Sequence, residues 1–269
     1  MSELKNLRAS LEYEFEVNYR FPVLECIIAI VVFVSVASSL DLAVRYADII
    51  QTWPNEPEFA YSNMMFVFDR VQEHALYVFG MSAYRVTLVL AFLVPLLIAY
   101  NVARGFEEGI FQTMLTYPIP RRRLLLFKTL IPITIIGVTT TVALVLTVYL
   151  AIPGVYSISA LFALSLAFWA HIILMVSVMT IISVFLKKTL PSALVGIGIW
   201  YGLSLLLATP DFPSGITSFI NPIILVMNMR VYGNIQELYS NVMFSIIVTF
   251  IVGLTMLFLS YRALKSAEV

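Results

Sequence analysis

Charged residues are scarce in this chain, and their scarcity excludes an ordinary soluble fold. Asp, Glu, Lys and Arg make up only 12% of the 269 residues, whereas 61% are hydrophobic. Soluble domains carry about 25% charged and about 45–50% apolar residues. A soluble fold cannot hide this much apolar surface, so the composition predicts a protein that lies in a membrane.

Residue patterns that support catalysis or metal binding are also missing. The single cysteine, Cys26, excludes an intrachain disulfide. His74 and His171 are far apart and neither belongs to an HExxH motif, so we expect no metal or other cofactor in this chain. No GxxxxGK pattern followed by Ser or Thr occurs, which excludes ATP hydrolysis through a P-loop of its own. The net charge of zero gives no reason to expect nucleic acid as a partner.

Six apolar stretches without Asp, Glu, Lys or Arg predict an all-α, polytopic transmembrane fold. A span needs about 20 consecutive apolar residues. The first stretch is long enough only if the helix begins near Val23 and tolerates Glu25 at its edge. We therefore predict one transmembrane domain, residues 1–269, whose six spans cover residues 26–40, 86–103, 129–154, 155–186, 189–210 and 242–261.

The distribution of basic residues predicts the orientation, because Lys and Arg are retained in cytoplasmic loops. With both termini in the cytoplasm, twelve of the sixteen Lys and Arg residues lie on the cytoplasmic side. Only Arg45, Arg70, Arg85 and Arg230 are then external. We therefore predict a multi-pass protein of the cell membrane with a cytoplasmic N-terminus and C-terminus.

Three segments outside the spans have their own character. Residues 1–21 predict an amphipathic helix at the membrane interface, which contacts lipid or, because it carries several glutamates, a protein partner. Residues 41–85 form the longest external loop. Residues 211–240 are interrupted by prolines and contain an apolar stretch too short to span the bilayer, which favours an external or re-entrant segment before the last helix.

The richest segment is the cytoplasmic loop of residues 104–123. Its apolar residues Phe106, Ile110, Met114 and Tyr117 share one face of a short predicted helix. We place Glu107 and Glu108 in the first turn of that helix, where its dipole favours negative charge, and Pro118 at its end. From these residues alone, a helix lying on the membrane and a helix docking on a partner are both open.

This loop resembles that of the membrane subunits of ABC type-2 transporters. In that family, acidic residues and a glycine precede a short apolar helix, a proline turn with an arginine, and a lysine. Pro120 and the pair Ile110-Phe111 depart from the residues more usual there. The matching residues are Glu107, Glu108, Gly109, Met114, Leu115, Tyr117, Pro118, Ile119, Arg121 and Lys128.

The resemblance implies a permease subunit of an ATP-driven exporter, with the loop as its coupling helix. ATP and Mg would bind to a separate cytoplasmic ABC ATPase subunit, and a second permease copy, identical or related, would complete the dimer. Phe106, Ile110 and Met114 would dock on the ATPase, and Glu107 and Glu108 would meet its basic residues.

Two other classes of function stay open. An ion-coupled secondary carrier is disfavoured because the central spans lack Asp and Glu. A membrane-embedded enzyme is supported only by the pair Glu107-Glu108, which lies at the wrong depth. For His171, in the fourth span, we favour an interhelical hydrogen bond over a role in transport.

Overall fold

The computed structural model describes residues 12, 23–52, 82–109, 121–151, 158–207, 219–223 and 235–266. Within these ranges all regular structure is helical, which confirms the predicted all-α fold. The amphipathic helix predicted for residues 1–21 lies outside the described residues, apart from Glu12. The long helices are α2 (Val23–Thr52), the helix Ser82–Glu107, α6 (Arg121–Ala151), α7 (Ile158–Leu186), α8 (Thr189–Leu207) and α11 (Ile235–Ser266).

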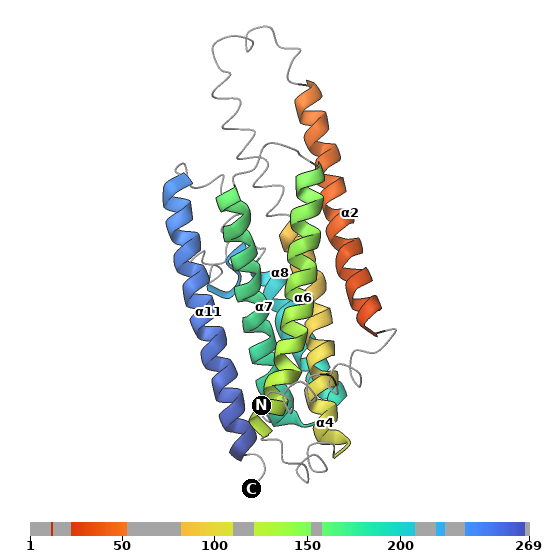
Figure 1. The fold of residues 1–269 in the computed structure, drawn as a ribbon, viewed down its shortest axis with the longest axis vertical. Helices are drawn as coiled ribbons and strands as arrows, with labels where there is room; N and C mark the ends of the chain where they lie inside the picture. The colour runs from red at the N-terminus through yellow and green to blue at the C-terminus, as the bar shows by residue number, and fades with distance from the viewer. Residues whose placement is uncertain are drawn as a thin grey trace.

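Successive long helices run antiparallel (Figure 1). The first residues of α2, α6 and α8 and the last residues of Ser82–Glu107, α7 and α11 lie toward one end of the bundle, at the bottom of Figure 1. We call this end, which carries Arg104, Glu107, Glu108 and Thr189, the Glu107 end. It is the end that the distribution of Lys and Arg predicts to be cytoplasmic.

Prolines account for several helix boundaries. The helix α2 ends at Thr52, two residues before Pro54, and α6 ends at Ala151, two residues before Pro153. The residue that precedes a proline disfavours helical geometry, so each helix ends before that residue. The turn predicted between the third and fourth spans therefore falls between the end of α6 and the start of α7.

Both flanking helices extend into the segment 41–85, which we had predicted to be an external loop. The helix α2 continues past residue 41 to Thr52, and Ser82 already belongs to the next helix. No Gly or Pro occurs between Val23 and Thr52, so nothing in the chain interrupts the helix where the apolar stretch ends. Charge marks the limit of an apolar stretch, but it does not end a helix.

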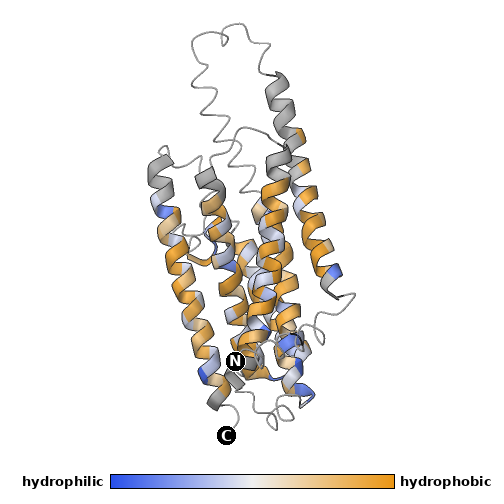
Figure 2. Cartoon of the chain, in the orientation of Figure 1, coloured by the Kyte–Doolittle hydropathy of each residue, from blue (hydrophilic) through white to orange (hydrophobic). Residues whose placement is uncertain are grey.

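Within the part of the chain that the structure describes, five helices are long and apolar enough to cross a membrane: Ser82–Glu107, Leu125–Leu146 within α6, Phe162–Leu186 within α7, Thr189–Leu206 within α8 and Ser240–Leu264 within α11. In α2 the apolar part, Glu25–Ser38, is shorter. Apolar residues run along most of the length of the bundle in Figure 2. Large side chains such as Phe33 and Phe185 are 72% exposed, as expected for surfaces that face lipid. The protein is therefore a multi-pass helical membrane protein.

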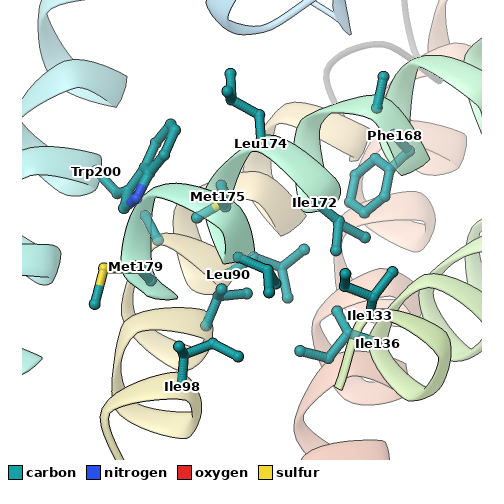
Figure 3. Packing of buried hydrophobic residues seen from close by; sticks show 14 of the residues in the cluster. Leu90, Ile98, Ile133, Ile136, Phe168, Ile172, Leu174, Met175, Met179 and Trp200 are labelled. Atoms are coloured by element: carbon teal, nitrogen blue, oxygen red, sulfur yellow. The ribbon is translucent and has the colours of Figure 1, made fainter. Parts of the chain in front are cut away.

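Two helices form the centre of the bundle. The spans of Ser82–Glu107 and α7 are each 67% buried, compared with 28% for α8 and 33% for α11. The helix α7 packs against α6, α8 and α11. Figure 3 shows part of this core, which contains Leu90 and Ile98, Met175 of α7 and Ile136 of α6. The spans of α8 and α11 are the least buried of the five.

A glycine sets the approach of α6 to α7. A Cβ atom at Gly137 would lie 2.8 Å from the ring of Trp169, closer than packed atoms allow. The Trp169 indole Nε1 also donates a hydrogen bond to Thr141 Oγ1, at 3.1 Å. The absence of a side chain at Gly137 therefore lets the indole lie directly on the backbone of α6.

Candidate functional site

The predicted coupling segment begins as the end of a membrane helix. The helix Ser82–Glu107 contains a π-helical stretch, Ala99–Ala103, and finishes with α4 (Arg104–Glu107). Glu108 follows in a turn, and Gly109 has a φ of 69°, a left-handed conformation that glycine adopts without strain. Arg121 begins α6. The other predicted coupling residues lie outside the described residues: Ile110, Met114, Tyr117 and Pro118.

Glu107 and Glu108 do not lie in the first turn of a separate helix, as we had predicted. They lie at the end of a helix that has run continuously from Ser82. The prediction was wrong because no helix-breaking residue separates the apolar span from Arg104, and the chain first leaves the helical conformation near Gly109. The dipole of their own helix disfavours acidic residues at this end, so their charges need other partners.

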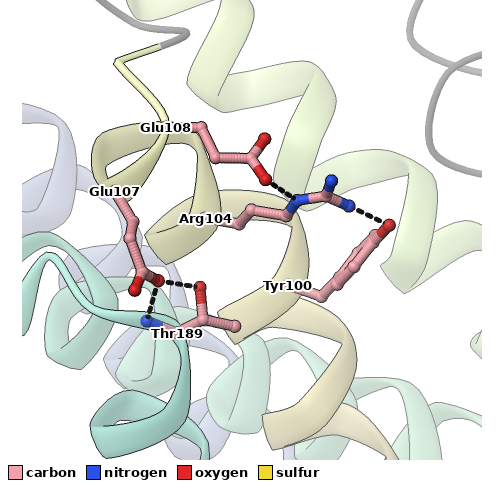
Figure 4. Close-up of polar contacts among 5 residues, drawn as sticks. All are labelled: Tyr100, Arg104, Glu107, Glu108 and Thr189. Carbon is pink, nitrogen blue, oxygen red and sulfur yellow. Dashed lines mark hydrogen bonds and ion pairs between the residues drawn. The ribbon is translucent and has the colours of Figure 1, made fainter.

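Glu108 is partnered within its own helix. Its Oε1 atom lies 2.6 Å from Nε of Arg104, one turn earlier. The Arg104 guanidinium also donates a hydrogen bond to the Tyr100 hydroxyl and lies over the Tyr100 ring, 4.6 Å from its centroid (Figure 4). These side chains stabilise the last turns of the helix, but the contacts described here connect it to no other helix.

Glu107 instead connects two helices. Its Oε2 atom accepts hydrogen bonds from the backbone N–H of Thr189, at 2.9 Å, and from the Thr189 hydroxyl, at 2.6 Å (Figure 4). Thr189 is the first residue of α8. The first N–H groups of a helix have no partner within it, and the dipole favours an anion there. The carboxylate of Glu107 therefore supplies the hydrogen-bond acceptor and the negative charge that the start of α8 lacks.

Phe106 makes a second contact with the same region. It is partly buried against the core of the bundle, and the ammonium group of Lys187 lies 5.9 Å from the centroid of its ring. Lys187 and Lys188 form the short connection between α7 and α8, and Lys187 has a φ of 53°. At this helix end, Phe106 thus contacts the α7–α8 connection, Glu107 contacts the start of α8, and Glu108 contacts its own helix.

His171, which we predicted to form an interhelical hydrogen bond, bonds a short segment instead of a long helix. Its side chain is only 2% exposed, and Nδ1 lies 2.8 Å from the carbonyl oxygen of Ile220. Because a carbonyl only accepts, Nδ1 carries the proton of this hydrogen bond. Ser177 and Thr180, the other polar residues near the middle of α7, donate to carbonyl groups of their own helix.

The segment 219–223 belongs to residues 211–240, which we predicted to be external or re-entrant. Thr249 of α11 makes a second contact with it: the Thr249 Oγ1 lies 2.8 Å from the carbonyl oxygen of Phe219 and 2.7 Å from that of Ser245 in its own helix, so the two carbonyls share one hydroxyl proton. His171 and Thr249 both lie near the middle of their helices. Backbone carbonyls at this depth need partners inside the protein. The contacts agree with a re-entrant arrangement, in which two neighbouring helices supply the missing donors.

Sequence reasoning did not identify Thr189, Lys187 or Thr249. In the sequence, a threonine that bonds only its own helix looks the same as a threonine that also contacts another segment. Among the residues that the structure describes, no three His, Cys, Asp or Glu side chains lie close enough to hold a metal ion. No family model matches the chain, and the search of curated proteins finds no match.

Proposed function

We propose that this chain is the permease subunit of an ATP-driven exporter of the ABC type-2 kind. A separate ATPase subunit binds ATP and Mg and docks on residues 104–123, and a second permease copy completes the pathway. The observation that carries the proposal is the position of this segment. It leaves the end of Ser82–Glu107, one of the two most buried helices, and returns as α6, so a force on the loop acts on the core.

The need for a separate ATPase subunit follows from the residues that this chain lacks. The chain has no P-loop, and its spans offer few ionisable groups that could carry protons or sodium. Movement of a substrate against a gradient therefore needs energy from another subunit. A loop with a predicted apolar face, between the central helix Ser82–Glu107 and α6, is a suitable place to receive it.

The docking face can be tested with a charge placed on it. We expect the tagged wild-type chain to co-purify from native membranes with a subunit that carries a P-loop and hydrolyses ATP. Ile110→Asp should reduce the recovered ATPase at least about tenfold, because a buried carboxylate on the apolar face costs more than about 1.4 kcal/mol.

Gln112→Asp is the matched control, because it adds the same charge to the same loop away from the predicted apolar face. It should leave recovery of the ATPase unchanged. Wild-type protein that transports its substrate in ATP-depleted vesicles, with no ATPase bound, would contradict the proposed function.

A further inference from the structure

The two adjacent glutamates at the Glu107 end have the same charge but different connections. Glu108 pairs with Arg104 of its own helix, whereas Glu107 receives two hydrogen bonds from the first residue of α8. Both carboxylates are exposed, so access to a docking partner does not distinguish them. What distinguishes them is that only Glu107 would carry a displacement of its helix end to α8.

We propose that Glu107 is a positioning residue that transmits movement of the coupling loop to α8. This inference rests on the proposed function and assigns Glu107 a role inside the permease, in place of a contact with the ATPase. Two donors on one residue fix both the distance and the direction of the carboxylate. Movement of this helix end therefore reaches the start of α8 through the single carboxylate of Glu107.

The position of α8 makes it a helix that can move. Its span is only 28% buried, compared with 67% for α7, so a smaller part of α8 is packed within the chain. It does contact α7, and the Tyr84 hydroxyl donates a hydrogen bond to the Ser204 carbonyl of α8, at 2.8 Å, farther along the helix than Thr189. Lys187 and Lys188 form the chain connection between α7 and α8, and Lys187 adopts a left-handed conformation. The contact of Lys187 with the Phe106 ring joins the same helix end to this connection.

The experiment uses the permease in complex with its ATPase, reconstituted in lipid nanodiscs. Cys26 is replaced by Ser, and Leu194, which is 60% exposed on α8, is replaced by Cys and labelled with an environment-sensitive fluorophore. We expect ATP and Mg to change the fluorescence of the otherwise unmodified complex. Glu107→Ala should reduce the amplitude at least about fivefold while the rate of ATP hydrolysis persists.

Matched variants separate transmission from a general loss of structure. Glu25→Ala removes an exposed carboxylate outside the coupling loop, at the start of α2, and should keep the full amplitude, because Glu25 makes no described contact with α8. Glu107→Gln keeps an oxygen acceptor and should restore most of the signal, and Thr189→Ser should preserve it. Equal amplitudes for Glu107→Ala and Glu25→Ala would overturn the inference.

Two further outcomes separate this inference from the function on which it rests. If the labelled complex hydrolyses ATP and transports substrate but shows no change at position 194, α8 does not receive the motion, and only the inference fails. If no ATPase binds the wild-type chain, the proposed function fails and the inference fails with it.

Discussion

The Glu107 end and the segment 219–223 are both held by side chains that bond backbone groups, but the side chains differ in charge. At the Glu107 end an exposed carboxylate accepts from the N–H of Thr189. At the segment 219–223, the imidazole of His171 and the hydroxyl of Thr249 donate to carbonyls. The charged contact lies where the chain carries its basic loops, and the uncharged contacts lie near the middle of the helices.

This difference follows from the cost of charge in an apolar environment. A charged side chain at the centre of a bilayer costs about 2.5–3.5 kcal/mol on insertion scales, whereas a hydroxyl costs much less. Contacts at depth therefore use neutral donors and serve to satisfy a buried backbone. A contact near water can use a carboxylate, which can exchange its partner for water at little cost. The uncharged contacts therefore suit a segment that stays in place, and the carboxylate contact suits a connection between helices that moves.

The largest expected effect is at His171. His171→Leu removes the donor to Ile220, leaving a partly buried carbonyl without its partner, and should lower the free energy of unfolding by about 1–3 kcal/mol. Thermal unfolding in mild detergent measures this. His171→Gln can still donate and should lose less, with ATP-driven transport preserved. Abolished transport in a stable His171→Gln protein would instead assign protonation chemistry to this residue.

A smaller effect is expected at Thr249. Thr249→Val removes the hydroxyl that the carbonyls of Phe219 and Ser245 share, and should destabilise by about 0.5–1 kcal/mol. Thr255→Val is the matched control in the same helix, because the exposed Thr255 hydroxyl bonds only the carbonyl of Ile251, one turn earlier. Equal losses for the two variants would show that Thr249 does not hold the segment 219–223.

The smallest effect on stability is expected at the pair Arg104–Glu108. Both side chains are about 40% exposed or more, and the ion pair is of the exposed kind, which contributes less than about 1 kcal/mol. Glu108→Ala should therefore change the unfolding temperature little, and the difference should shrink further in about 1 M salt, where the Debye length is about 3 Å. The loss in His171→Leu should not depend on salt. A loss of stability in Glu108→Ala that does not depend on salt would contradict this difference between the exposed ion pair and the buried hydrogen bond.

The spans could be predicted from the sequence because two local signals determine them. Apolar length places five of the described helices in the membrane, and Pro153 places the end of α6 to within a few residues. For α2, apolar length placed the end of the span at residue 40, whereas the helix continues to Thr52. A different signal gave the wrong position for Glu107 and Glu108. The loop motif indicated a new helix at residue 104, whereas the helix from Ser82 simply continues to Glu107.

The contacts of the candidate site could not be predicted, because they join residues that are distant in the chain. Thr189 is 82 residues from Glu107, and Phe219 is 30 residues from Thr249. The Thr180 hydroxyl contacts a carbonyl of its own helix, whereas the Thr249 hydroxyl contacts both its own helix and the segment 219–223, and no local pattern distinguishes these cases. Only the packing of the helices decides which carbonyl or carboxylate comes within reach.

Hydrogen–deuterium exchange of the reconstituted complex, with and without ATP and Mg, tests most directly whether the Glu107 end moves while the segment 219–223 stays in place. The account predicts that ATP changes the exchange of backbone amides in residues 104–109 and 187–192 and leaves residues 219–223 unchanged. A change confined to residues 219–223, with residues 187–192 unaffected, would contradict it.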